Sequence, residues 1–358
     1  MTTQTPESMA DDLLARLPAS PDAYPQKLDL VREMVLLVRL DAAAYRAASF
    51  LDDRILSPAT QGAWLSIGRV AEAARRAVNP RPVHFIFHTG HVGSTLVSRL
   101  LDETGEVLSL REPLPLRTLA EAGDVLELPD SLLSPAQFDL ALALFMRLWS
   151  RGYDRTRSVV VKATSSAGRL AVPILAGNPA AHAIYMNLHA EPYVATLLAG
   201  QNSPLDLRGH GPERIRRLAA RLGAALAPLH ALSLGELAAM SWLAETLTQR
   251  DAVRQFGRRI LAVDFETFLS NISDGMTRIV SHFALPCDAR YLAEVGRSPV
   301  LTRYSKAPEY SYTPSIRTEG LRDSRRDNRV EIRKGLDWLA GLARFHAAVA
   351  EAVTGAAI

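Results

Sequence analysis

The sequence predicts an α/β fold, a three-layer sandwich in which helices cover both faces of a parallel sheet of four or five strands. Short apolar and β-branched runs, typical of buried strands, recur along the chain at residues 83–87, 106–110, 158–162, 182–187 and 258–265. Segments with apolar residues at helical spacing separate them, such as 138–149 and 234–247. Strands that alternate with helices favour a parallel sheet covered on both sides.

The regions that flank this pattern differ from it. Residues 28–51 and 63–78 repeat apolar residues at helical spacing, and the Asn79-Pro80 pair then ends the pattern. We therefore expect a helical N-terminal extension over residues 1–78 and an α/β domain over 79–299. Residues 300–358 should form an irregular segment to about residue 330 and a closing helix over 330–353, packed on the same domain.

Composition excludes several classes of protein. The 358 residues are 48% hydrophobic and 22% charged, as in an ordinary globular protein. The net charge of +3 gives no argument for nucleic acid. Cys287 is the single cysteine, so no intramolecular disulfide and no zinc-type Cys/His spacing is present, and we expect no metal. No apolar run reaches the roughly 18 residues that a membrane span needs.

The same observations set our expectations for location and partners. The first residues, MTTQTPESMADDLL, are acidic where a signal peptide would be basic and apolar. We expect a cytoplasmic protein, bacterial by its Ala- and Arg-rich composition, with no membrane or nucleic-acid partner. A homo-oligomer is compatible with these observations, and a small-molecule or peptide partner is left open.

The most informative stretch is VHFIFHTGHVGSTLVSRLL, residues 83–101. It reads as a strand, a turn of small residues and an apolar helix. The N-terminus of a helix presents unpaired N–H groups and the positive end of the helix dipole. Gly90 and Gly93 allow close approach of the backbone to an anion, and Ser94 and Thr95 add hydroxyl donors. The pattern predicts a loop that binds a phosphate or sulfate group.

Nucleoside-triphosphate loops, G-x-x-x-x-G-K-[ST], fit this stretch poorly. When Gly93 is aligned with the second glycine, the first glycine falls on His88 and the lysine on Ser94. Asp264 is the nearest candidate for a magnesium-binding aspartate after a strand. A P-loop phosphotransferase therefore remains a third hypothesis only.

The stretch resembles the phosphosulfate loop of sulfotransferases, which ends in Lys/Arg-Ser-Gly-Thr/Ser-Thr before an apolar helix. This chain has His91-Val92-Gly93-Ser94-Thr95. The resemblance continues over about residues 83–285. Its further matches are Arg111-Glu112-Pro113 with Arg117, Lys162 at the end of a strand, IYMNLHAEPYVATLLAG (184–200) and LAVDFETFLSN (261–271).

The resemblance implies transfer of a sulfuryl group from 3′-phosphoadenosine 5′-phosphosulfate to an acceptor hydroxyl or amine, with no metal. Glu112 is the implied general base, Lys162 the cation that neutralises developing charge, and His91 the residue at the loop-cation position. The implied donor-binding residues are Gly90, His91, Val92, Gly93, Ser94 and Thr95. We expect Arg111 and Arg117 to keep Glu112 ionised.

Two implied ligands of the donor's 3′-phosphate are replaced in this chain. An arginine falls on Ala190 and a serine on Leu198. The glycine-rich lid motif near the C-terminus of the family also has no match. Replacement cations would have to come from elsewhere, and Arg303, Lys306 and Arg317 are the candidates. We expect adenosine 3′,5′-bisphosphate to bind more weakly than is usual for the family.

Other interpretations remain open beside the enzymatic one. Glu112 and its neighbouring arginines are equally compatible with a surface salt bridge. Lys162 is equally compatible with a lysine that ends a strand and reaches solvent. The basic run 317–334 contains interspersed acids, which favours a solvated helix face. The second function hypothesis is a non-catalytic module that binds a phosphate, a nucleotide or a partner protein.

Overall fold

The computed structural model describes residues 6–355 and is built around a parallel sheet in the order β5-β6-β4-β7-β8. Each neighbouring pair is parallel, so the carboxyl ends of all five strands meet at one edge. The α/β class and the five predicted strands are confirmed, with shifts of one or two residues at their ends. The strands are β4 (Val83–His88), β5 (Val107–Arg111), β6 (Ser158–Lys162), β7 (Ala183–Asn187) and β8 (Ile260–Asp264).

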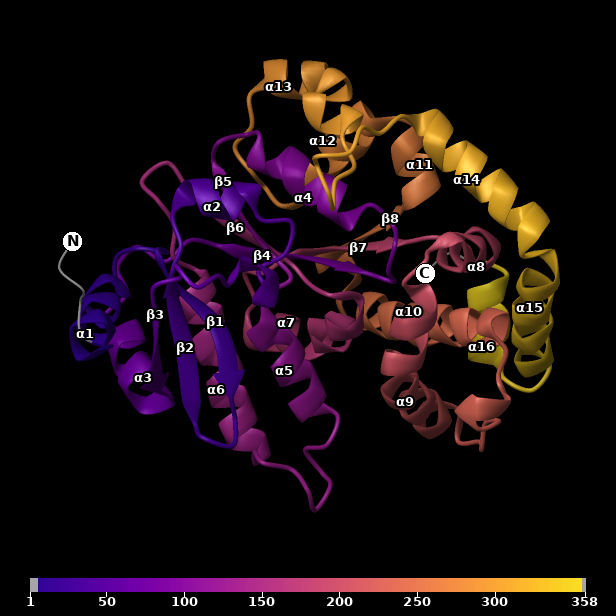
Figure 1. Cartoon of the computed structure of the whole chain (residues 1–358), viewed down its shortest axis with the longest axis horizontal. Coiled ribbons are helices and arrows are strands. Elements are labelled where there is room, and N and C mark those ends of the chain that lie inside the picture. The colour runs from indigo at the N-terminus through magenta and orange to yellow at the C-terminus, as the bar shows by residue number, and fades with distance from the viewer. Residues whose placement is uncertain (1–5, 356–358) are drawn as a thin grey trace.

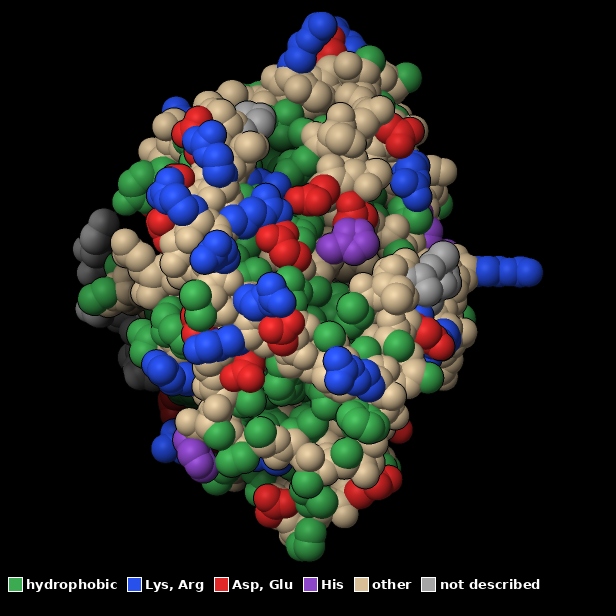
Figure 2. All heavy atoms as spheres, turned by 90° about the vertical axis from the view of Figure 1, so that its right-hand side faces the viewer, with side chains coloured by type: hydrophobic (Ala, Val, Ile, Leu, Met, Phe, Trp, Pro, Cys, Tyr) green, Lys and Arg blue, Asp and Glu red, His purple; other side chains and the backbone are tan. Residues whose placement is uncertain are grey.

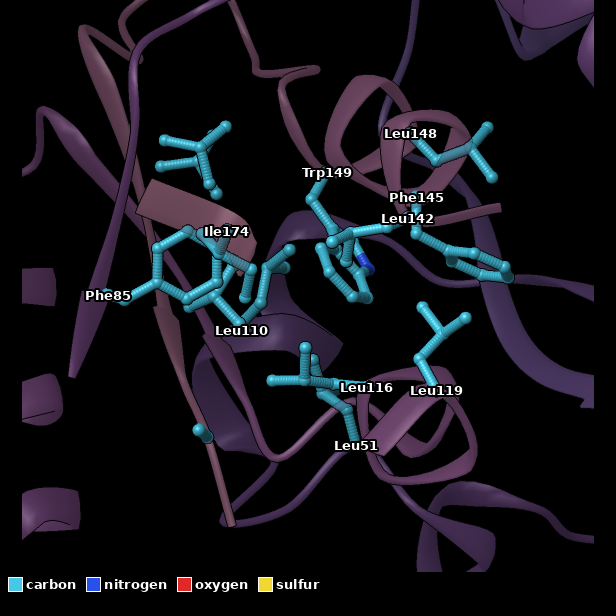
Figure 3. Close-up of a cluster of buried hydrophobic side chains, with 14 of the residues drawn as sticks. Leu51, Phe85, Leu110, Leu116, Leu119, Leu142, Phe145, Leu148, Trp149 and Ile174 are labelled. Atoms are coloured by element: carbon cyan, nitrogen blue, oxygen red, sulfur yellow. The ribbon is translucent and has the colours of Figure 1, made fainter. Parts of the chain in front are cut away.

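Alternate side chains of the sheet enter two separate cores. Phe85 and Phe87 of β4 belong to one buried cluster, whereas Ile86 belongs to the other. Helices lie against both faces (Figure 1), and Figure 3 shows part of the first core. This is the predicted three-layer sandwich. The first face is covered by α5 (Leu114–Gly123), α6 (Pro135–Trp149) and α7 (Ala171–Gly177), and the second by α4 (Ser94–Asp102), α8 (Ala190–Ala199), α10 (Leu234–Phe256), α11 (Phe265–Ser270) and α12 (Ile272–His282).

The predicted helix over residues 28–51 is wrong. These residues contribute to a second, antiparallel sheet in the order β1-β2-β3. In the central strand β2, Val35 and Leu37 are fully buried while Leu36 is less so, an alternation with period two. A short apolar run fits a buried strand as well as a helix, and pairing on both sides decides for the strand. The elements are α1 (Pro6–Arg16), β1 (Ala23–Asp29), β2 (Met34–Arg39), α2 (Ala42–Ala47), β3 (Gly62–Ser66) and α3 (Ile67–Arg75).

The region after residue 300 is more helical than predicted. Helix α14 (Pro314–Asp327) begins where the side chain of Thr313 accepts a hydrogen bond from the N–H of Ile316. The expected closing helix is divided into α15 (Arg329–Ala343) and α16 (Ala347–Val353). Residues 302–312 remain irregular and fold back on themselves through a bridge between Arg303 and Ser311. We call residues 302–312 the strap.

The basic run 317–334 lies on α14 and α15 at the right of Figure 1. Its cations pair with nearby acids, for example Arg326 with Asp323 at 3.1 Å and Lys334 with Glu331 at 2.8 Å. Figure 2 shows this side of the molecule with basic and acidic side chains interspersed. The arrangement is that of a solvated helix face.

The remaining helices are α9 (Ser203–Leu222) and α13 (Ala289–Glu294). None of the helices within residues 6–355 combines the length and the apolar character that crossing a membrane requires.

Candidate active site

The predicted anion loop lies between β4 and α4 at the carboxyl edge of the sheet. Gly90, His91 and Gly93 have φ angles of 106°, 54° and 69°, all in or near the left-handed region. Turns with residues of this kind gather backbone N–H groups into a concave nest that attracts anions. Gly93 is also the N-cap of α4, and no side chain caps the helix there. A Cβ at Gly93 would overlap the ring of Phe265, so this position requires glycine for space as well as for its φ angle.

The donors of this loop have no protein acceptor among residues 6–355. Within the described part of the chain, the backbone N–H groups of residues 90–95 donate no hydrogen bond. The hydroxyl of Thr95, which is 1% exposed, likewise has no partner in the described chain. Buried donors are nearly always satisfied in folded proteins. An anion against the N-terminus of α4 would satisfy both sets of donors.

Lys162 and Glu112 meet beside this loop. Lys162 is the last residue of β6, and Glu112 directly follows the neighbouring strand β5, whose last residue Arg111 is paired with Lys162 in the ladder. Nζ of Lys162 forms an ion pair with Oε1 of Glu112, and the N–H of Glu112 donates to the Lys162 carbonyl at 2.6 Å. Glu112 has a φ of 55°, a conformation that costs a non-glycine residue free energy and is often found at functional sites.

The expected partners of Glu112 are wrong. The buried guanidinium of Arg111 pairs with Asp102, on the other side of its strand, and Arg117 pairs with Glu121 at 2.9 Å. Arg111 ends β5 with its side chain towards Asp102 of α4, whereas Glu112 follows the strand in a left-handed conformation and pairs with Lys162. The alternative interpretation of Lys162, a lysine that reaches solvent, is excluded because Lys162 is fully buried. Neither the surface salt bridge nor the solvent-reaching lysine describes this pair.

Electrostatic conditions in the site follow from burial and from its cations. Burial lowers the pKa of Lys162, although the Glu112 carboxylate partly offsets this, and Lys306 lowers that pKa further. The His91 side chain is exposed. Desolvation by neighbouring groups and the charges of Lys306 and Lys162 lower the pKa of His91 to about 3. His91 is therefore neutral at pH 7 and acts as a hydrogen-bonding group in the place of a loop cation.

Two of the three candidate replacement cations lie near the loop. Lys306 of the strap is close enough to affect the charge of His91 and Lys162, and its own pKa is lowered by burial and raised by Glu112. Arg317 stacks over the ring of Phe265, 5.2 Å from its centroid. This is the same ring that packs on Gly93.

Arg303 is exposed, and among the described residues its side chain forms no hydrogen bond or ion pair with residues 90–95. The strap itself is held against α4, because Nε of Arg99 donates to the carbonyl of Ser305 at 2.7 Å.

The aligned 3′-phosphate positions lie on α8 and offer no charge. Ala190 and Leu198 are partly buried and pack against the second core. The nearby Arg325 is engaged by Glu191 through two hydrogen bonds of 2.8 and 2.7 Å. Helix α8 contains no lysine or arginine, and the nearby Arg325 is already paired with Glu191.

No metal cluster accompanies the site. Within residues 6–355, no group of three or more His, Cys, Asp or Glu side chains is arranged to hold a metal ion. Asp264 caps α11 by accepting hydrogen bonds from the N–H and the hydroxyl of Thr267, both at 2.8 Å. The Asp264 carboxylate, which the sequence suggested as a candidate magnesium ligand, thus serves as the N-cap of a helix.

The sequence missed three side chains of this site. Phe50 and Arg54 come from the N-terminal region that was predicted to be helical, and Phe265 follows β8. Phe50 lies 5.6 Å from Nζ of Lys162, measured to the ring centroid, and 3.6 Å from the Arg54 guanidinium. No local pattern marks these residues, because only the packing of distant segments brings them to the sheet edge.

Comparisons with known proteins give distant structural similarities. No family model matches the chain, and a search of curated proteins gives no match. Similar solved structures include the sulfotransferase domain of the curacin biosynthetic pathway, with 13% identity, a TM-score of 0.38 and coverage of 65% of this chain and 84% of that one.

Two others are also sulfotransferases. The sulfotransferase domain of the Synechococcus PCC 7002 olefin synthase has 14% identity, a TM-score of 0.39 and coverage of 77% and 94%. A Mycobacterium avium sulfotransferase has 14% identity, a TM-score of 0.38 and coverage of 89% and 96%.

Proposed function

We propose that this protein is a sulfotransferase that moves a sulfuryl group from 3′-phosphoadenosine 5′-phosphosulfate to an acceptor hydroxyl or amine. One observation carries the proposal: the Glu112–Lys162 pair lies at the same sheet edge as a loop whose N–H donors are unsatisfied. Ligand sites of open α/β sheets are found at this edge. The arrangement supplies a base, a buried cation and an anion cradle within one site.

Each residue of the site would have a role that follows from its chemistry. The 90–95 loop would hold the phosphosulfate through its backbone N–H groups and the hydroxyls of Ser94 and Thr95. Glu112 would accept the proton of the attacking acceptor group. Lys162 and Lys306 would stabilise negative charge that develops during transfer. When bound, the donor supplies an activated sulfuryl group, and the protein contributes position and electrostatics.

The donor's two ends fit this chain unequally. The loop fits the 5′-phosphosulfate, because it has free donors and the required glycine. The 3′-phosphate meets Ala190 and Leu198, which can donate no side-chain hydrogen bond. Lys306 and Arg317 are the cations placed to compensate, with Arg303 as a third candidate in the strap.

Calorimetric titration tests the proposal. We expect adenosine 3′,5′-bisphosphate to bind and to be preferred over ADP and ATP. Equal or stronger binding of ATP would favour the P-loop phosphotransferase. Binding of the bisphosphate without sulfuryl transfer to a panel of hydroxyl and amine acceptors would favour the non-catalytic module, which the apolar residues Ala190 and Leu198 already support. Failure of every anion to bind would contradict both enzymatic hypotheses and would leave only a module that binds a partner protein.

A further inference from the structure

Residues 45–54 belong to the N-terminal region but are attached to the end of β5, next to Glu112. The N–H of Leu51 donates to the carbonyl of Arg111 at 2.6 Å. In return, Nη1 of Arg111 donates to the carbonyls of Tyr45 and Ala48 at 3.0 and 2.8 Å. We call residues 45–54 the wall segment.

Burial fixes this attachment. Leu51 is fully buried and belongs to the first core, together with Leu110 and Leu116 (Figure 3). Its carbonyl accepts a hydrogen bond from the hydroxyl of Tyr24 at 3.1 Å. Arg111 itself is 1% exposed and is held by its ion pair with Asp102. The wall segment is therefore fixed to the main sheet by buried contacts on both sides of Phe50.

Phe50 projects from this segment between two cations. The guanidinium of Arg54 lies 3.6 Å from its ring centroid, and Nζ of Lys162 lies 5.6 Å from it. Cation–π attraction reaches to about 6 Å, so the contact with Lys162 is near its outer limit. At that distance the ring serves chiefly as an apolar barrier, and Glu112 is the hydrogen-bond partner of Nζ among residues 6–355.

We infer that Phe50 is a positioning residue, which excludes water from Lys162 and so holds the Lys162 ammonium against Glu112. The inference rests on the proposed function, since it assigns the wall segment a part in the same site. Without the ring, water would reach Nζ and compete with the carboxylate. The N-terminal region would then be part of the reaction site as well as an addition to the fold.

Several other charges act on the same ammonium. They must be intact for Phe50 to be tested alone, and they are Glu112 and Arg111 at the end of β5, Lys306 of the strap, and His88 and His91 beside the loop. Arg54 of the wall segment acts on Glu112 and on Lys306 and must also be kept.

NMR titration of the lysine side chains tests the inference directly. The chain has only four lysines, Lys27, Lys162, Lys306 and Lys334, so Lys162→Gln assigns the signal of Lys162. We expect Lys162 to titrate below the exposed Lys334. In Phe50→Ala its titration should move up towards that of Lys334, by about one pKa unit or tenfold in the protonation equilibrium.

Matched variants distinguish the exclusion of water by the Phe50 ring from a general loss of structure. Phe50→Tyr keeps the ring and should titrate as the original protein does. Phe345→Ala removes a ring that is 84% exposed and should have no effect. If Phe50→Ala fails to fold, Phe50→Leu replaces it, with a smaller upward shift expected because a smaller apolar group remains.

An unchanged Lys162 titration in a folded Phe50→Ala or Phe50→Leu protein would overturn the inference. The readout is independent of turnover. Absence of sulfuryl transfer with every acceptor would count against the proposed function, while the titration would still decide the role of Phe50.

Discussion

Nζ of Lys162 and Oε1 of Glu112 form a largely buried ion pair between the ends of two neighbouring parallel strands. Removing one partner of such a pair leaves an uncompensated charge. The two side chains therefore depend on each other, and any change at Glu112 also changes Lys162.

Changing Glu112 to Gln should lower turnover by roughly 10²–10⁴-fold, because the base is lost while size is kept. Affinity for adenosine 3′,5′-bisphosphate should remain nearly the same. The loss of the carboxylate should also lower the pKa of Lys162 further, since Glu112 is the group that raises it. Steady-state kinetics and calorimetry measure these effects. Glu121→Gln, at an exposed acid paired with Arg117, is the control. Full activity of Glu112→Gln would refute the assignment.

Changing Gly93 to Ala should abolish anion binding at the loop. The added Cβ would overlap the Phe265 ring, and φ is positive at this position, so the N–H groups at the start of α4 must shift. Binding of sulfate or adenosine 3′,5′-bisphosphate can be followed by calorimetry. Gly68→Ala is the control, because Gly68 is an exposed residue of α3 with open space around its Cα. Unaltered binding by Gly93→Ala would place the anion elsewhere.

Changing Lys306 to Gln should weaken binding of adenosine 3′,5′-bisphosphate about tenfold or more, because a charge-assisted hydrogen bond contributes roughly 1.5–3 kcal/mol. The effect should fall as salt is added. Lys334→Gln, at an exposed lysine of α15, controls for loss of a positive charge. Equal affinities of the two variants would exclude Lys306 as a replacement cation.

Changing Gly335 to Ala should destabilise the protein by about 1–3 kcal/mol, as overpacking does. Gly335 of α15 faces Gly235 of α10, and a Cβ there would overlap the Gly235 carbonyl. Gly341→Ala, in the same helix but with open space, should instead stabilise by about 0.5–1 kcal/mol. Urea unfolding measures both. A neutral result at Gly335 would mean that the two helices separate without cost.

Acid should destabilise the fold partly through His84. Burial, helped by His182 and His282, lowers the pKa of His84 to about 4. In the unfolded chain it is about 6.5, so between these values the unfolded state binds more protons. The contribution of His84 is fully present above pH 6.5 and is lost as the pH falls towards 4, at about 1.4 kcal/mol per pKa unit.

Comparing the free energy of unfolding at pH 7 and pH 5 tests this sign. The difference should be smaller in His84→Asn, whose amide oxygen can still accept the hydrogen bond that Nδ1 takes from the N–H of His182. His230→Asn, at an exposed histidine, should keep the full difference. A difference in His84→Asn as large as in the original protein would exclude His84 as a source of the acid sensitivity.

Local sequence predicted the central sheet well. The runs that became β4, β6 and β7 are mostly apolar without alternation, because both faces of a parallel sheet are buried, and each lies between segments of helical spacing. The loop at Gly93 was also visible, since a strand, a turn of small residues and an apolar helix are adjacent in the chain.

The hydrophobic pattern predicted the wrong secondary structure where one apolar run is compatible with both a helix and a strand. Residues 34–39 are a short apolar run that satisfies a helix and a strand equally, and only their pairing with β1 and β3 decided. Residues 314–327 were expected to be irregular because their sequence is polar. They form a helix that begins with a capped turn and packs on α8.

The sequence by itself determined the α/β class, the anion loop and the placement of Glu112 and Lys162 at strand ends, because these depend on neighbours in the chain. Tertiary structure decided which charges pair. Lys162 took the role expected of Arg111 and Arg117 because adjacent parallel strands bring their ends together. Lys306 and Phe50, far apart in sequence, reach the same edge only because hydrogen bonds hold the strap to α4 and the wall segment to the end of β5.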